Sequence, residues 1–215
     1  MSSLLIADDH PVVRAALQMV LGALKDANNK PLFQAVEQAT NAIDALKTIR
    51  EHSPSLVVLD LQMPGLSGLE FLARLQRERL PSRVVVFTSH EPRFYVERCM
   101  RGGAMGFVEK SNDLDELCKA VKALMSGYTY FPRLETSSVN QSLLQMDEQK
   151  MIDRLSDREL TIFQHLARGS SNKEIAERMH LSHKTVSTYK TRLIEKLNVQ
   201  SLVHLRDFAQ RNHLL

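Results

Sequence analysis

The chain has 215 residues, of which 43% are hydrophobic and 25% are charged, and its net charge is +3. These values are typical of globular proteins, exclude general disorder and allow two domains of modest size. The longest apolar runs are far shorter than the roughly 20 residues that cross a bilayer. The N-terminus also lacks the basic segment of a secretory signal, so we expect a cytoplasmic protein without a membrane partner.

The first 127 residues alternate short apolar runs with longer amphipathic segments. Three of the short runs are nearly continuous and rich in β-branched residues, as in strands that are covered on both faces. We expect strands over residues 4–7, 32–38, 56–60, 83–89 and 106–110, and helices over 11–27, 40–51, 67–79, 92–102 and 112–126. Five strand–helix units predict an α/β fold, a (βα)5 doubly wound parallel sheet that binds ligands at the carboxyl ends of its strands.

The pattern weakens between Gly127 and Lys150, where a polar SSVNQS stretch predicts a linker with a helical turn near residues 143–146. The pattern beyond Met151 is entirely helical. Four serines are candidate N-caps, the first two within S-x-x-E capping boxes: Ser156, Ser171, Ser182 and Ser201. The sequence therefore predicts domains at 1–127 and 151–215, the second an all-α domain of four helices, joined by a linker at 128–150.

Charge is unevenly spread between these parts. Residues 1–127 carry 15 basic and 15 acidic side chains, whereas residues 128–215 carry 13 and 10. Six of the basic side chains lie beyond His180: Lys184, Lys190, Arg192, Lys196, Arg206 and Arg211. A local basic excess favours a polyanionic partner for the C-terminal domain, although lysines on a solvated helix would look the same.

Five polar side chains fall at the ends of predicted strands: Asp8, Asp9, Asp60, Thr88 and Lys110. Any one of them could be an ordinary loop residue or a helix cap, but all five occupy one edge of one predicted sheet. Clustered carboxylates need a cation, and a hydrated site of oxygen ligands suits Mg²⁺. A carboxylate there can act as a nucleophile toward a phosphoryl group whose oxygens a lysine and a hydroxyl hold.

The same residues resemble a known family. The Asp8-Asp9 pair, Asp60 followed by LQMPGLSG, the FTSH around Thr88 and the GFVEK that ends in Lys110 are similar to the CheY-like receiver domain of two-component response regulators, which has a flavodoxin-like fold. The resemblance implies that Asp60 is the phosphoacceptor and that Thr88 and Lys110 contact the phosphoryl group. It also implies that Mg²⁺ is held by Asp8, Asp9, Asp60 and the backbone carbonyl of Gln62. Phe107 stands where many receivers carry a switch tyrosine and is expected to act without the hydroxyl.

The segment from Ser182 to Asn198 reads as an amphipathic helix. At about 100° per residue, one face carries the apolar residues Val186, Leu193, Ile194 and Leu197, with Tyr189 at its edge. The other face carries hydroxyls, cations and one carboxylate: Lys184, Ser187, Thr188, Thr191, Arg192 and Glu195. A preceding helix joined by a short turn through His180 gives the spacing of a helix-turn-helix motif, and the outer face suits the major groove of DNA. A plain amphipathic helix in a small bundle would have the same pattern.

The C-terminal strings LSDREL and GSSNKEIAERMHLSHKTVSTYKTRLIEKLNV resemble the LuxR-type DNA-binding domain. Together the two domains resemble response regulators of the NarL/FixJ class, nearest the BvgA/EvgA-type subgroup, which often has asparagine at the position of His183. The resemblance implies DNA contacts by Lys184, Thr185, Ser187, Thr188, Lys190, Thr191 and Arg192. It also implies that the last helix, residues 201–212, supplies much of the dimer contact in the DNA-bound state. Its apolar residues could form that surface or cap the domain core: Val203, Leu205, Phe208 and Ala209.

We therefore expect a phosphorylation-dependent transcription regulator that is not an enzyme beyond phosphotransfer and slow dephosphorylation at Asp60. The expected partners are a sensor histidine kinase or phosphorelay donor domain, double-stranded promoter DNA, a second copy of the chain and RNA polymerase. One alternative is a metal-dependent phosphohydrolase, although Leu61 and Gln62 follow Asp60 where a haloacid-dehalogenase-type enzyme has an Asp-x-Asp pair. Another alternative is a receiver whose helical domain binds protein or RNA.

Overall fold

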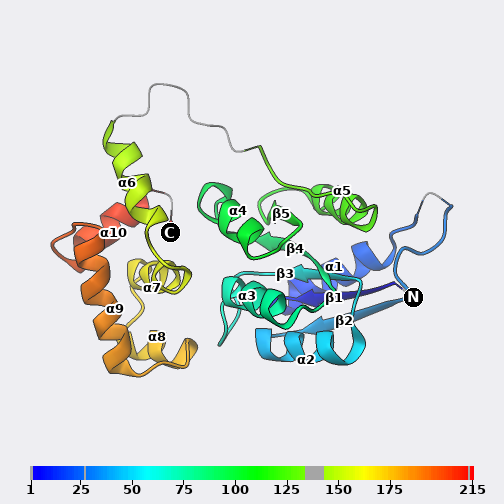
Figure 1. Cartoon of the computed structure of the whole chain (residues 1–215), viewed down its shortest axis with the longest axis horizontal. Coiled ribbons are helices and arrows are strands. Elements are labelled where there is room, and N and C mark those ends of the chain that lie inside the picture. The colour runs from blue at the N-terminus through cyan, green and yellow to red at the C-terminus, as the bar shows by residue number, and fades with distance from the viewer. Residues whose placement is uncertain (1, 27, 134–142, 213) are drawn as a thin grey trace. The chain divides into compact units, whose positions relative to one another are not determined.

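The chain forms two compact units, Met1–Arg133 and Leu134–Leu215 (Figure 1). The structure is a computed structural model that describes residues 2–26, 28–133, 143–212 and 214–215, with side chains in the third range described from Glu148 onward. Among the helices in these ranges, none has both the length and the apolar character needed to cross a membrane.

The first unit contains a parallel sheet of five strands with the order β2-β1-β3-β4-β5. The strands are β1 (Ser3–Ala7), β2 (Ala35–Ala39), β3 (Leu56–Leu59), β4 (Arg83–Thr88) and β5 (Gly106–Glu109). The helices are α1 (Pro11–Gly22), α2 (Ala42–His52), α3 (Gly68–Glu78), α4 (Pro92–Arg101) and α5 (Leu114–Met125). Five alternating strand–helix pairs around a parallel sheet confirm the predicted fold class.

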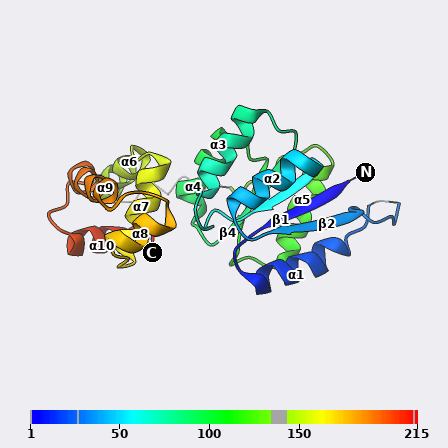
Figure 2. The same cartoon turned by 90° about the horizontal axis from the view of Figure 1, so that it is seen from below.

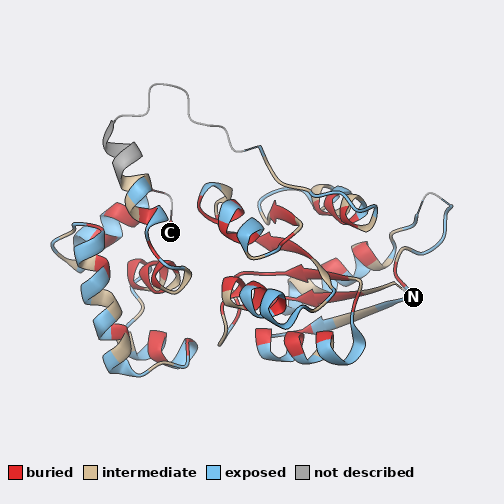
Figure 3. Cartoon of the chain, viewed as in Figure 1, coloured by how far each residue is buried: buried red, intermediate tan, exposed pale blue. Residues whose placement is uncertain are grey.

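Both faces of the sheet are covered, as continuous apolar strands require. Leu4 and Ile6 of β1 share a core with Leu17 of α1 and with two fully buried leucines of α5, Leu117 and Leu124. Figure 2 shows α1 and α2 on opposite sides of the sheet, and Figure 3 shows the central strands buried along most of their length. The strand ends are therefore the part of the sheet that is left to bind ligands.

Two predicted boundaries are wrong by several residues. The strand expected over 32–38 begins only at Ala35. The helix expected over 11–27 ends at Gly22, because the chain then folds into a tight loop. In that loop Lys25 pairs with Pro31 as an antiparallel bridge, and the Asp26 carboxylate accepts the N–H groups of Asn28 and Lys30 at 2.8 and 2.9 Å. Aspartate satisfies turn backbone in this way at the expense of helix.

The chain that leaves α5 returns along the free edge of β5. The N–H of Tyr130 donates to the carbonyl of Met105 at 2.9 Å, and the N–H of Phe107 donates to the carbonyl of Tyr130 at 2.8 Å. The Tyr130 hydroxyl donates to Glu116 of α5. A Cβ on Gly106 would lie 3.1 Å from the Tyr130 carbonyl oxygen, so glycine lets the two segments approach this closely.

The second unit is entirely helical in the range that is described. Its helices are α6 (Leu143–Asp153), α7 (Asp157–Ala167), α8 (Asn172–Arg178), α9 (His183–Lys196) and α10 (Leu202–Arg211). Ser156, Ser171, Ser182 and Ser201 each accept a hydrogen bond from the third residue of the following helix, and the first two form complete capping boxes. All four predicted N-caps are thus confirmed, while the single turn expected near residues 143–146 is a helix of 11 residues.

The core of the second unit lies between α7, α9 and α10. Phe163 of α7 and Phe208 of α10 meet edge to face, with ring centroids 6.1 Å apart. Leu205, Phe208 and Ala209 are buried, whereas 68% of Val203 is exposed. The sequence left two roles open for the four apolar residues of the last helix, a dimer surface or the domain core. These three residues belong to the core of the unit. Val203 is the one of the four that is left at the surface.

Candidate functional sites

The carboxyl ends of β1, β3 and β5 bring two acids and a lysine into contact. The Lys110 Nζ lies 2.7 Å from Asp8 Oδ2 and 2.7 Å from Asp60 Oδ2. Asp8 and Asp60 are almost fully buried, with 2% and 3% exposed, and Lys110 is 15% exposed. Residues 102 positions apart in the sequence thus meet at one edge of the sheet, as the strand pattern predicted.

The loop after β3 fixes the orientation of Asp60. The N–H of Gln62 donates to Asp60 Oδ1 at 3.1 Å, which leaves Oδ2 to Lys110. The loop closes by a bond from the N–H of Gly68 to the carbonyl of Leu61 at 3.1 Å. A Cβ on Gly68 would lie 2.6 Å from Leu61 Cα and 3.0 Å from the Asp60 carbonyl oxygen, so this close approach requires glycine.

The remaining acid completes a cluster of candidate metal ligands. Ligand atoms of Asp8, Asp9, His10 and Asp60 all lie within 4.8 Å of one another. Asp9 Oδ1 is buried and accepts no hydrogen bond from the described residues, and the ring nitrogen Nδ1 of His10 lies 2.7 Å from it as an ion-pair partner when protonated. Three carboxylates, one of them with an unsatisfied buried oxygen, fit a hard divalent cation such as Mg²⁺.

Charge and burial act against each other in this pocket. Burial raises the pKa of Asp60 above its usual value, although Lys110 opposes the shift. Burial alone would lower the pKa of Lys110, but attraction by Asp60 and Asp8 outweighs it and raises that pKa. Because two buried carboxylates share one ammonium group, an added cation would lower the free energy of their charged forms.

Thr88 and Phe107 lie on the two strands beside the pocket. Thr88 is fully buried at the end of β4, and its hydroxyl accepts the N–H of His90 at 3.4 Å. The N–H of Lys110 donates to the Thr88 carbonyl at 2.7 Å, so the ends of β4 and β5 are joined. Phe107 on β5 is 1% exposed, with its ring in the core. His10 is the member of the cluster that the sequence analysis missed, and its adjacency to Asp8-Asp9 was the available signal.

The second candidate site is the outer face of α9. Val186, Leu193 and Leu197 are buried, while Tyr189 and Ile194 are half-buried, which confirms the predicted inner face. The outer face is exposed as predicted: Lys184, Ser187, Thr188, Thr191, Arg192 and Glu195. Thr185 and Lys190 are half-buried at the boundary between the two faces.

Hydrogen bonds define what this face offers. The Thr188 hydroxyl donates to the carbonyl of Lys184 at 3.0 Å, and the Thr191 hydroxyl donates to that of Ser187 at 3.3 Å. Each threonine oxygen can still accept a hydrogen bond, and each methyl group is fixed by the same bond. Such a surface can meet base-edge donors and thymine methyl groups in a major groove.

Two of the basic side chains that were counted beyond His180 form ion pairs within the second unit. Lys196 donates to both carboxylate oxygens of Glu159 at 2.7 and 2.8 Å, and Arg211 donates to Glu148 at 2.9 Å. Glu159 is itself the third residue of the α7 capping box, so the Lys196 bond joins the end of α9 to the start of α7. The basic surface that the sequence predicted is therefore smaller by two cations.

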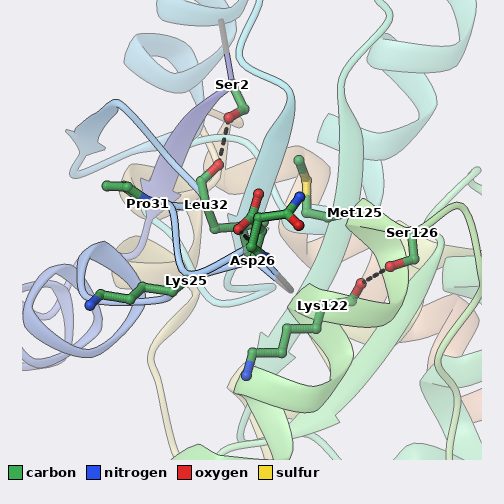
Figure 4. Close-up of a pocket in the computed structure, with 9 residues that line it drawn as sticks. Ser2, Lys25, Asp26, Pro31, Leu32, Lys122, Met125 and Ser126 are labelled. Carbon is green, nitrogen blue, oxygen red and sulfur yellow. Dashed lines mark hydrogen bonds between the residues drawn. The ribbon is translucent and has the colours of Figure 1, made fainter.

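A hollow of about 670 Å³ lies at the opposite end of the sheet, between the loop after α1 and the end of α5 (Figure 4). Its hydroxyl groups already donate to the main chain, Ser2 to the Leu32 carbonyl and Ser126 to the Lys122 carbonyl. Lys25 and Lys122 line its walls. It shares no residue with the acidic cluster.

The fold and the two sites define a regulator built from an acidic-pocket α/β domain and a helix-turn-helix domain. Residues 4–122 match the response regulator receiver domain, and residues 153–209 match the bacterial regulatory proteins of the luxR family. The chain belongs to the response regulators that carry a luxR-type DNA-binding domain. Receiver domains of this kind bind Mg²⁺ at an acidic pocket, and the family regulates transcription rather than acting as ordinary enzymes.

Relatives of similar length support the assignment over the whole chain. The chain is 48% identical over 213 residues to the virulence-factor transcription regulator BvgA of Bordetella pertussis, a match that covers 99% of each chain. It is 34% identical over 212 residues to the DNA-binding transcriptional activator EvgA of Escherichia coli K12, with 98% of each chain covered.

Solved structures show the same fold. RcsB of Salmonella enterica serovar Typhimurium, bound to the promoter rprA in the presence of the phosphomimetic BeF3-, matches with a TM-score of 0.69 at 23% identity, over 98% of this chain and 99% of that one. A LuxR-family two-component response regulator from Aurantimonas matches with a TM-score of 0.54 at 29% identity, over 60% of this chain and 89% of that one.

Proposed function

We propose that this chain is a phosphorylation-dependent regulator of transcription in a two-component system. In this proposal Asp60 accepts a phosphoryl group from a sensor histidine kinase or phosphorelay donor, and the C-terminal domain binds promoter DNA as a dimer. The observation that carries the proposal is the buried Asp60 carboxylate, 2.7 Å from the Lys110 ammonium at the edge where Asp8 and Asp9 also lie. The receiver domain is assigned to residues 1–127, the linker to 128–150 and the DNA-binding domain to 151–215.

The phosphotransfer step uses groups of this chain. An Asp60 oxygen attacks phosphorus, the P–N bond to the donor histidine breaks, and the imidazole nitrogen keeps the electron pair and takes up a proton. Lys110 and the Thr88 hydroxyl would hold oxygens of the transferred group. Mg²⁺ would be held by Asp8, Asp9, Asp60 and the Gln62 carbonyl, and when bound it offsets negative charge on the phosphoryl group.

The transferred charge would bias a two-state equilibrium of the receiver. Thr88 would be drawn toward the phosphoryl oxygens, and the region of Phe107 would repack as it follows. Phe107 has no hydroxyl, so its part in the switch is limited to packing. A state that binds DNA as a dimer would then become the major population, with RNA polymerase as a further partner.

The DNA contacts are proposed for the exposed and boundary residues of α9: Lys184, Thr185, Ser187, Thr188, Lys190, Thr191 and Arg192. Cations there would contact phosphates or guanine edges, and the threonines would contact base edges. For the dimer, we propose the exposed start of α10, where Leu202 is 38% and Val203 is 68% exposed.

The decisive experiment measures phosphate uptake by the purified chain from acetyl phosphate and Mg²⁺, by intact mass and by Phos-tag electrophoresis. We expect one acid-stable, base-labile phosphoryl group on the native chain and none on Asp60→Asn. A matched control is Asp115→Asn, which changes an exposed aspartate of α5 and should leave uptake unchanged.

Three other outcomes would overturn the proposal. Uptake that persists in Asp60→Asn would place the phosphoacceptor elsewhere. Rapid turnover of an exogenous phosphoester by the native chain would identify a phosphohydrolase. For the helical domain, binding to RNA or protein with no sequence preference among duplex DNA fragments would contradict promoter recognition.

A further inference from the structure

The main chain of Asp8 is held from two sides. Its N–H donates to the carbonyl of Ala39 on β2 at 3.2 Å. Its carbonyl accepts a hydrogen bond from Arg14 Nη1 of α1 at 2.8 Å. The loop that carries Asp8 and Asp9 is therefore fixed by a strand on one side and by a single guanidinium group on the other.

Arg14 is itself held in place. Its Nε donates to Gln38 Oε1 on β2 at 3.1 Å, and Gln38 Nε2 donates to Gln18 Oε1 on α1 at 2.6 Å. The guanidinium group is planar, and its donors point in fixed directions, so one side chain can bind the loop carbonyl and the β2 amide at once. A lysine, with one flexible ammonium, cannot reproduce this pair of directions.

The loop needs such support because α1 begins without a side-chain cap. His10 occupies the N-cap position and makes no side-chain capping bond, whereas α2, α3 and α5 are each capped by a side chain. The Asp8 carboxylate is meanwhile bonded to the N–H of His10 through Oδ1 and to Lys110 through Oδ2. Movement of the Asp8 backbone would therefore displace both acids of the loop.

We propose that Arg14 is a positioning residue of the metal site, which acts through the Asp8 carbonyl and contacts neither metal nor phosphate. The inference rests on the proposed function of the pocket. Mg²⁺ tolerates little deviation from octahedral geometry, so its affinity depends on how firmly the carboxylates are held. Outer-shell partners of metal ligands typically change metal affinity by roughly 10- to 100-fold when removed.

The alternative role for Arg14 is purely electrostatic, and it has the opposite sign. A cation beside the acids repels Mg²⁺, so loss of the charge alone would strengthen Mg²⁺ binding. Positioning predicts that Mg²⁺ binding weakens. Arg14→Lys separates the two roles further, because it keeps the charge and loses the two-directional donor.

The test is a Mg²⁺ titration of the full chain, followed by the NMR shifts of residues in the pocket and by calorimetry. The variants are Arg14→Ala, Arg14→Lys and the control Arg101→Ala, which changes an exposed arginine of α4 that pairs only weakly with Glu97. We expect the Mg²⁺ dissociation constant to rise about tenfold in both Arg14 variants and to stay unchanged in the control. Thermal unfolding in the absence of Mg²⁺ checks that each variant is folded.

Each outcome can be assigned. An unchanged or lower dissociation constant in a folded Arg14→Ala variant overturns the positioning role, and so does full retention of affinity by Arg14→Lys. If Arg14→Ala fails to fold, Gln38→Ala, which removes only the outer support of the guanidinium, should still weaken Mg²⁺ binding by a measurable factor. A native chain that binds no Mg²⁺ would instead contradict the proposed function of the pocket.

Discussion

Single side chains decide the electrostatics of the acidic pocket. Lys110 contacts two buried carboxylates at 2.7 Å, and within the described residues Asp9 adds a third acid to the cluster without a second ammonium group. The cost of burying charged groups is offset only when an ion pair has good geometry and hydrogen bonds. Asp8 and Asp60 have such a partner in Lys110, whereas Asp9 has no ammonium partner among the described residues. The pocket is therefore left with a net negative charge, which favours a divalent cation.

His165 gives a prediction at the same scale. Burial, together with Arg178 and Arg168, lowers its pKa to about 4 from the usual 6.5. The unfolded chain then binds more protons between these pH values, so the free energy of unfolding falls as the pH drops from 6.5 toward 4. We expect His165→Gln to remove about 2 kcal/mol of this loss.

The measurement is urea unfolding followed by circular dichroism at about pH 7, 5.5 and 4.5, which spans the interval between the two pKa values. The control is His204→Gln, which changes an exposed histidine of α10. Its free energy of unfolding should fall with pH as much as that of the native chain. An identical pH dependence of the native chain and His165→Gln would show that His165 is not held neutral in the folded state.

At the scale of elements, most helix starts could be predicted because their signals are local. A serine with a glutamate three residues later is such a signal, and Ser156 and Ser171 cap α7 and α8 as expected. The end of α1 could not be predicted in this way, since the Asp26 turn competes with a helical pattern of similar strength. The length of α6 was also not predicted, because a short polar helix and a linker have similar amino-acid compositions.

The cap of α9 supports a second prediction. Ser182 Oγ accepts the N–H of Thr185 at 3.0 Å and lies 2.7 Å from its hydroxyl. Loss of an N-cap costs about 1 kcal/mol, so Ser182→Ala should lower the free energy of unfolding by that amount. Ser187→Ala, in the exposed middle of the same helix, is the matched control, and chemical denaturation is the measurement. Equal stability of the two variants would contradict the capping role.

At the scale of the whole molecule, phosphorylation should change both DNA affinity and assembly. We expect acetyl phosphate with Mg²⁺ to increase promoter affinity by at least about tenfold and to raise the dimer fraction. The reason is that the phosphoryl group stabilises the receiver state that binds DNA as a dimer more than it stabilises the other state. Fluorescence anisotropy with a promoter duplex and analytical ultracentrifugation measure the two effects. Asp60→Asn should show neither, and equal affinity with and without acetyl phosphate in the native chain would rule out the switch.

The sequence predicted the sheet and the meeting of Asp8, Asp60 and Lys110, because the carboxyl ends of parallel strands share an edge. It could not reveal contacts that depend on three-dimensional packing. The hydrogen bond from Arg14 ends at the backbone carbonyl of Asp8. Every residue has such a carbonyl, so the residue types in the sequence do not indicate this bond. The pairing of Lys196 with Glu159 joins residues 37 positions apart and engages a cation that the charge count had included in the basic excess of the C-terminal domain.

The return of Tyr130 along β5 has a consequence for solubility. β5 is an outer strand of the sheet, and an uncovered outer strand can recruit a strand from another molecule and start aggregation. The Met105 carbonyl and the Phe107 N–H are already occupied by Tyr130, so an incoming strand would first have to displace it. Intermolecular strand addition is thereby disfavoured at this margin of the sheet.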